Sequence, residues 1–422
     1  SVLINKVLGP KVGKAGGDRD QDTVFALGAA RNRARPYEPV GLSFGSVRIA
    51  PDYLSQPYTY YEGDQQYLAM ILTPGINVDS VEALYNGDAL LSSYQGVEVW
   101  HSGFPGMPEQ PIPLYSNADT VAGGELENNG PFVYRTTSAD TERVQIDLEG
   151  MLYDVDKHGT IHGNTVPVYI QWRTVGGQWQ GVSMQTIANG NTRVIRRTYT
   201  VAFPSAGQYE VAVRLGIPRW NEGSGKDECR FTWTTLKSIQ PDHATYNGIG
   251  RIGIRMRASG QLNGTPDEIR CVVHSRPIPV WKGAQWVTER TSNPGAQILA
   301  YARGIASGGE RVAGMGLADD MIDVPALQAF MLHCAEQGYT YGYWLTEARS
   351  HDEVVNSIAR AGFGQISWAG GKLSVVWAAD DQPLSGVVNM ATIKKGSFQV
   401  DYTLANAADG VEVSYFDAET WT

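Results

Sequence analysis

Arg251-Ile-Gly-Ile-Arg-Met-Arg-Ala-Ser-Gly-Gln-Leu-Asn-Gly-Thr-Pro-Asp267 is the stretch of sequence that decides the fold. Apolar and polar residues alternate in its first half, which predicts a half-buried strand, and its Gly, Asn, Pro and Asp residues then predict a turn. A second strand is expected from Cys271 to Val280, and Asn293-Pro294 is expected to open a helix. No side chain in this run indicates a catalytic reaction, so its interest lies in the order of its elements.

The composition indicates a multidomain globular protein rich in β structure. The chain of 422 residues is long enough for about two to four domains, and its 48 glycines, 21 prolines, 21 tyrosines and 11 tryptophans favour turn-rich sheets. No apolar run approaches the roughly 20 residues of a membrane helix, and Ser1–Lys6 lacks the pattern of a signal peptide. Cys229, Cys271 and Cys334 are widely spaced, so we expect free, buried thiols in a protein made in a reducing cytoplasm.

The net charge of −10 is unevenly distributed along the chain. Residues 1–130 carry 8 basic and 15 acidic side chains, residues 131–240 carry 12 and 10, and residues 241–422 carry 14 and 19. An acidic body argues against affinity for nucleic acid, because binding to phosphates needs clustered Lys and Arg. An acidic surface would instead repel passing double-stranded DNA and so allow it to move along the protein without binding.

The first part of the chain combines an arm, a set of strands and a loop. Residues 1–30 offer little to bury and are expected to form a flexible arm. Strands are expected around 47–49, 67–72 and 81–85, with a tight turn after the last of them. Residues 102–131 hold several prolines and glycines, which predict a long loop or linker.

Residues 132–240 have the alternating pattern of half-buried strands separated by turns, which indicates a β-sandwich inserted into the acidic remainder. The apolar positions of this pattern are Val144, Ile146, Leu148, Val168, Ile170, Trp172, Tyr209, Val211, Val213, Leu215, Phe231 and Trp233.

Helices are expected late in the chain. One helix should run between Asp323 and Gly338, where apolar residues recur at helical spacing, and a capping box of Ser350 and Glu353 should open another. Strands are expected after it, over Gln365–Trp368 and Leu373–Trp377 as a hairpin, then over Ser397–Tyr402 and Val411–Phe416.

Two short motifs resemble functional sites. Gly41-Leu-Ser-Phe-Gly45 fits the G-x-S-x-G pattern of a hydrolase, but that motif needs a strand before it and a helix after it, and a strand-like segment follows here. Asp154-Val-Asp-Lys-His-Gly159 resembles the start of a calcium loop, although Thr165 stands where a bidentate Glu is required. His158 and His162 suit a metal only on a helix, and the surrounding glycines favour a solvated hairpin loop.

The other candidate groups also favour structural interpretations. His333 and Cys334 are helix neighbours whose side chains diverge by about 100°, so they do not form a nucleophilic pair. The remaining candidates are the acid pairs Asp319-Asp320 and Asp380-Asp381, the incomplete glycine motif Gly314–Asp319, and the aromatic residues Trp179, Trp220 and Trp286. Paired acids need a cleft, and an aromatic residue on a strand is more often in a core than on a sugar. The sequence therefore assigns no catalytic, cofactor-binding or metal-binding residue.

Four segments, taken in order, resemble the central hub region of the tail-tip attachment protein (host-specificity protein J) family of long-tailed, lambda-like bacteriophages. They are Asn32–Val40 with Gly45 and Arg48; Gly87–Leu90 with Gly96–Val99; Arg251–Pro294; and Leu327–Trp377 with Lys395–Phe398, Asp401-Tyr402 and Val411–Asp417. Each motif is weak alone, but their joint order is specific, and together they span most of residues 31–417.

This resemblance implies a mainly β, multidomain fold with a smaller α/β part. The implied order is a flexible arm (1–30), a barrel-like first hub domain (31–131), an inserted sandwich (132–240), a continued hub domain (241–318), and an α/β hub domain with a helix–helix–hairpin unit and closing strands (319–422).

The resemblance also implies a structural protein of the virion, not an enzyme and without cofactors, assembled in the cytoplasm of the bacterial host. The expected assembly is a homotrimeric ring that caps the tail tube, supports host-attachment parts and lets DNA pass without binding it specifically. The expected partners are the tail tube, distal tail and tape-measure proteins, with the host receptor contacted through other regions. We further expect acidic residues of 1–130 or 241–422 to line the channel.

The competing hypothesis is a carbohydrate-binding module or glycosidase used in attachment to the host surface. It needs an aromatic-lined surface, and the enzyme also needs two carboxylates about 5–9.5 Å apart.

Overall fold

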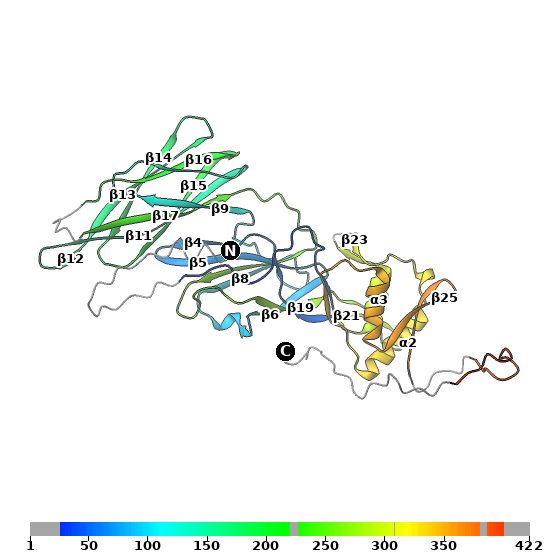
Figure 1. Ribbon diagram of the computed structural model, residues 1–422. Helices are drawn as coiled ribbons and strands as arrows, with labels where there is room; N and C mark the ends of the chain where they lie inside the picture. The colour runs from blue at the N-terminus through cyan, green and yellow to red at the C-terminus, as the bar shows by residue number, and fades with distance from the viewer. Residues whose placement is uncertain (1–25, 220–226, 308, 380–385, 401–422) are drawn as a thin grey trace.

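The computed structural model describes residues 26–219, 227–307, 309–379 and 386–400. Sheets dominate these residues, and the three α-helices among them belong to one unit. Figure 1 shows three parts in a row: a sandwich built from β9 to β17, a pair of hub sheets in the centre, and a helical unit that carries α2 and α3. The expected class, mainly β with a smaller helical part, is confirmed.

The hub consists of two antiparallel sheets, with strand orders β3-β5-β18-β8 and β2-β19-β6-β7; β4 also pairs with β5. Their strands are β2 (Ser46–Ile49), β3 (Asp52–Tyr53), β4 (Tyr58–Glu62), β5 (Gln65–Gly75), β6 (Val78–Asn86), β7 (Ala89–Leu90), β8 (Val97–Ser102), β18 (Gly250–Arg257) and β19 (Ile269–Ser275). Apolar residues of both sheets share one core, in which Met70 and Ile254 pair across β5 and β18. Strands from before and after the sandwich therefore complete the same sheets.

The sandwich packs two sheets over a core of the apolar residues expected from the alternation. Its strands are β9 (Ala118–Leu126), β10 (Val133–Thr136), β11 (Thr141–Val155), β12 (Ile161–His162), β13 (Asn164–Thr174), β14 (Gln180–Asn189), β15 (Ile195–Gly207), β16 (Tyr209–Leu215) and β17 (Glu228–Ile239). One sheet has the order β10-β16-β13-β14; the other has the order β12-β11-β17-β9, with β15 also on β11. Val144, Ile146 and Leu148 of β11 are completely buried, which confirms the predicted pattern.

The helical unit packs α1, α2 and α3 against short hairpins around Phe330 and Met331. Its elements are β20 (Ile278–Trp281), β21 (Trp286–Glu289), α1 (Pro294–Arg303), β22 (Ile305–Ser307), β23 (Glu310–Ala313), α2 (Val324–Gln337), β24 (Tyr343–Leu345), α3 (His351–Arg360), β25 (Gly364–Ala369) and β26 (Lys372–Trp377). Short 3₁₀ turns occupy Leu91–Ser93 and Asp319–Met321.

The predicted helix boundaries are confirmed because each has a capping group. The side chains of Asn293 and Asp323 accept N-cap hydrogen bonds for α1 and α2, and Ser350 with Glu353 forms the capping box of α3. Gly338 ends α2 in the left-handed conformation, at a φ of 71°.

Several expectations need correction. The segment 271–280 forms two strands, β19 and β20, and the expected linker 102–131 contains β9, whose Ala118 and Leu126 are buried. Residues 397–400 carry no strand, while 401–402, 411–416 and residues 1–25 of the expected arm (1–30) lie outside the described residues. The end of that arm does not fit the expectation, because Leu27 and Ala30 are buried in the hub core. The described hub sheets are open and do not close into a barrel. Within the described chain, no helix is long and apolar enough to cross a membrane.

Candidate functional site

The sandwich is seated on the hub through β4, the edge strand of a hub sheet. The Tyr58 ring of β4 is buried, and its hydroxyl accepts a hydrogen bond from the backbone N–H of Tyr115 at 3.0 Å. Tyr58 and Ala69 of the hub share a small apolar core with Ala118 and Ile239 of the sandwich. Ala118 begins β9 and Ile239 ends β17, so this core closes the two points where the chain crosses between the parts.

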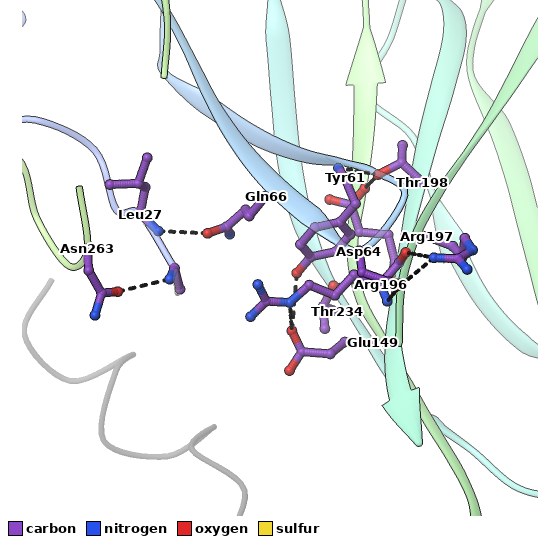
Figure 2. A network of polar contacts seen from close by, with 12 residues as sticks. Leu27, Tyr61, Asp64, Gln66, Glu149, Arg196, Arg197, Thr198, Thr234 and Asn263 are labelled. Atoms are coloured by element: carbon purple, nitrogen blue, oxygen red, sulfur yellow. Dashed lines mark hydrogen bonds and ion pairs between the residues drawn. The ribbon is translucent and has the colours of Figure 1, made fainter. Parts of the chain in front are cut away.

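A polar network beside this core joins β4 to β15, as Figure 2 shows. The backbone N–H of Tyr61 donates to Thr198 Oγ1 at 2.8 Å. Asp64, in the turn after β4, accepts from the backbone N–H of Arg196 at 3.1 Å and from Arg197 Nη1 at 2.5 Å. Edge-strand backbone groups, which would otherwise be left to solvent, are thereby used to attach the sandwich.

A second layer of the network surrounds the Tyr61 ring. The guanidinium of Arg196 lies 5.4 Å from the ring centroid, and its Nε donates to Glu149 Oε2 at 2.9 Å. The Arg196 side chain is 7% exposed, so solvent screens this ion pair weakly. Burial, with the nearby Glu149 carboxylate, raises the pKa of the Tyr61 hydroxyl well above its ordinary value. The ring therefore stays neutral and serves as a packing surface.

Beneath the network lies a buried ion pair of the sandwich. Lys237 Nζ contacts Asp147 Oδ2, with side chains 1% and 3% exposed, and Thr198 Oγ1 donates to Asp147 Oδ1 at 2.5 Å. Thr198 thus links a buried charge pair to the hub strand. Sequence reasoning missed this site because Tyr61 and Thr198 are 137 positions apart and neither belongs to a motif.

The G-x-S-x-G segment is a structural strand. Leu42–Phe44 forms β1, which pairs with β24, and the Ser43 side chain is completely buried. A Cβ on Gly41 would lie 2.2 Å from the Trp344 indole nitrogen, and Gly45 has a φ of +61°. Both glycines are therefore required by packing and backbone conformation, and no nucleophile elbow forms.

A Ser–His–Glu row that the sequence did not indicate crosses a hub sheet. Ser46 Oγ lies 2.8 Å from His274 Nδ1, and His274 Nε2 lies 3.0 Å from Glu82 Oε2. The three residues come from adjacent strands, β2, β19 and β6, so their contacts are those of cross-strand neighbours. Glu82 is 63% exposed, unlike the buried acid of a catalytic triad, and we assign the row a structural role.

The possible calcium loop is the hairpin between β11 and β12. Asp156 Oδ1 accepts from the backbone N–H groups of His158 and Thr160, and Asp156 Oδ2 lies 3.0 Å from His162 Nε2. These hydrogen bonds, with His162 first, hold the pKa of Asp156 well below its usual value. The oxygens of this carboxylate are thus already hydrogen-bonded within the loop. Among the described residues, no three His, Cys, Asp or Glu side chains gather as a metal site.

The other candidate residues are dispersed. Cys334 is completely buried in the helical core, and burial raises the pKa of its thiol to about 12, which suits a packing role. Asp319 pairs with Arg303 at 2.8 Å, and Trp286 packs on Trp281. Trp179 contacts Tyr134 on the sandwich, while Trp220 and Asp380-Asp381 lie outside the described residues.

Comparison with known proteins identifies the sandwich. The model of the tip attachment protein J FNIII-A domain matches residues 116–242, the segment bounded by the two crossing points. No curated protein matches the sequence.

Solved structures resemble the chain only weakly. The receptor-binding domain of the spike protein P1 of bacteriophage PM2 is 12% identical, with a TM-score of 0.18 over 29% of this chain and 92% of that chain. A chain of the entire bacteriophage PM2 is 10% identical, with a TM-score of 0.18 over 54% and 75% of the two chains. A chain of infectious bursal disease virus is 10% identical, with a TM-score of 0.19 over 75% and 72%. These scores are too low to support an argument about fold or function.

The family match and the ordered sequence resemblance agree, although the match covers only the inserted sandwich. Residues 116–242 match the FNIII-A domain of tip attachment protein J, and this match supports the J family of phage tail-tip proteins.

Proposed function

We propose that this chain forms the hub of a phage tail tip, a ring that caps the tail tube, supports the attachment parts and lets the genome pass. The observation that carries the proposal is the way the FNIII-A domain is inserted. The strand before it, β8, pairs directly with the strand after it, β18, with Val99 opposite Ile254. The domain is therefore an insertion between two neighbouring strands of one hub sheet, and the pairing of these strands does not require it.

The proposed ring contains three copies of the chain, as the resemblance to the J family implies. A closed ring buries the same surfaces on every subunit. The helical unit offers an apolar surface for such a contact. Phe363 and Val376 are 67% and 55% exposed, and both line a hollow beside Arg360 at the end of α3. Phe363 also has a φ of 54°, a strained conformation for an aromatic residue, which directs an apolar ring outwards.

The proposed partners are the tail tube, distal tail and tape-measure proteins, with the host receptor contacted through other regions of the assembly. The acidic excess of residues 1–130 and 241–422 supports a channel that DNA crosses without binding. The role is structural and non-enzymatic, and assembly takes place in the host cytoplasm before the virion is complete.

The test is the mass of the 422-residue chain in solution, measured by light scattering over a range of protein concentrations. A trimer of 46.0 kDa subunits and three-fold rings in electron micrographs are expected. A mass of one subunit at every concentration, with no rings, would overturn the proposal.

A further inference from the structure

The outer sheet of the FNIII-A domain presents an aromatic and cationic surface that the hub function does not use. In Figure 1, β13, β14 and β16 lie on the side of the sandwich away from the hub strands β4 and β5. Val211 and Val213 of β16 are buried in the core, so the alternate residues Ala212 and Arg214 belong to the outer face.

Two aromatic rings form the centre of the surface, the exposed Tyr134 and the half-buried Trp179. Tyr134 of β10 is 50% exposed, and its ring centroid lies 5.5 Å from that of Trp179, at an angle of 41°. The Arg173 guanidinium lies 4.4 Å from the Trp179 ring and also pairs with Glu210 at 2.6 Å. Ala212, opposite Tyr134 in the sheet, is completely buried although it belongs to the outer face. The rings are therefore held in place over the sheet.

A cation without a carboxylate partner lies beside these rings. The Arg214 guanidinium is 5.1 Å from the Phe132 ring centroid and 4.8 Å from that of Tyr169. In the described parts of the chain, no carboxylate lies within ion-pair distance of Arg214, and its buried Nε has no hydrogen-bond partner. Because Arg214 is two residues from Ala212, it lies roughly 7 Å along the strand from the Tyr134 row.

We propose that this face binds an acidic polysaccharide, with a sugar ring stacked on Trp179 and Tyr134 and an anionic group of the sugar bound by Arg214. Flat aromatic faces suit the apolar side of a sugar ring, and a guanidinium packed on two aromatic rings can bind a carboxylate or sulfate. Residues 131–240 carry 12 basic and 10 acidic side chains in a chain whose net charge is −10, so this domain repels an anion less than the acidic segments on either side of it do. Nucleic acid is disfavoured, because it needs several cations along the phosphate backbone.

The experiment is affinity electrophoresis of the full chain in gels that contain dextran sulfate, polygalacturonate or neutral dextran. Dextran sulfate and dextran differ only in the anionic group, and polygalacturonate separates carboxylate from sulfate recognition. We expect retardation in at least one acidic gel and little in dextran. Trp179→Ala should weaken the apparent affinity at least about tenfold, which corresponds to the loss of about 1.4 kcal/mol, whereas Trp179→Phe should retain most of it.

The controls separate this site from general charge and from misfolding. Arg214→Gln should weaken retardation in acidic gels, whereas Arg230→Gln, which removes an Arg 67% exposed on the opposite sheet, should not. Trp368→Ala removes a 53% exposed tryptophan from the helical unit and should have no effect. Circular dichroism and thermal unfolding report whether each variant is folded.

No retardation in either acidic gel, equal effects of the two Arg variants, or no effect of Trp179→Ala would overturn the proposal. Competition by oligo-dT at a lower concentration than either acidic polymer would also overturn it and indicate a nucleic-acid site. None of these outcomes depends on the oligomeric state, so the hub proposal is tested separately.

Discussion

The hydroxyl of Thr198 joins two parts of the molecule, because it accepts a hydrogen bond from the backbone N–H of Tyr61 at 2.8 Å. The same hydroxyl donates to Asp147 Oδ1 at 2.5 Å. One side chain thus provides a hydrogen-bond acceptor to a hub strand and a hydrogen-bond donor to the carboxylate of a buried ion pair. The FNIII-A domain is therefore held in a defined orientation and not only tethered by its two crossing segments.

Thr198→Val should loosen this joint. The substitution keeps the shape of the side chain but leaves the Tyr61 N–H and one Asp147 oxygen without their partner, at a cost of about 1–3 kcal/mol. We expect a lower melting temperature and a broader distance distribution between spin labels placed on the hub and on the sandwich. Thr186→Val, at an exposed position of β14, is the control and should change neither. Equal distance distributions for the two variants would contradict a fixed joint.

The Lys237–Asp147 pair should be costly to break but not to replace. Lys237→Ala leaves a buried carboxylate without its cation, which should destabilise the sandwich by about 3–5 kcal/mol. The double replacement Lys237→Met with Asp147→Leu removes both charges and should recover much of that loss. Urea unfolding followed by circular dichroism compares the three proteins. A double variant less stable than Lys237→Ala would show that the ion pair itself, not the absence of an isolated charge, stabilises the core.

The ring contact is tested by two valine substitutions of equal chemistry. Val376→Ser, in the proposed subunit contact, should raise the concentration at which the trimer dissociates by about tenfold or more, since each contact loses about 1 kcal/mol of apolar burial. Val175→Ser is the matched control, because Val175 is 54% exposed and Val376 is 55% exposed. Analytical ultracentrifugation measures both. Equal dissociation by the two variants would place the subunit contact elsewhere.

The sequence predicted elements well where a local pattern specified them. The alternation in β11 placed Val144, Ile146 and Leu148 in the core, and the capping box of Ser350 and Glu353 located the start of α3. Local patterns do not show pairing between distant strands. For this reason the sequence of β9 resembles a linker: its central residues, 121–124, are mostly small or exposed, and only its pairing with β17 makes it a strand.

The same limit applies to the functional residues. The joint depends on Tyr61, Asp64, Thr198 and Glu149, which the chain brings together only because β4 passes under β15 and β11. The sequence indicates Trp179 only as one of several aromatic candidates. Its neighbours, Tyr134 across the sheet and Arg173 beneath it, required the register of the strands. Motifs in the sequence exclude a hydrolase site at Ser43. They do not reveal the contact between the hub and the sandwich or the aromatic face around Trp179.

The loop between β11 and β12 should respond to pH through Asp156. Since the folded-state pKa of this carboxyl lies below its ordinary value of 3.8, the hydrogen bonds it accepts should be fully present above pH 3.8 and lost as the pH falls through the lower, folded-state pKa. Carboxyl carbon NMR titration of Asp156 measures this directly. In His162→Gln the titration should move back towards 3.8, because the imidazole is the largest cause of the shift. In His158→Gln it should not move, because His158 is exposed and donates to Asp156 through its backbone N–H. A wild-type midpoint at or above 3.8, or equal shifts in the two variants, would show that His162 does not hold the loop.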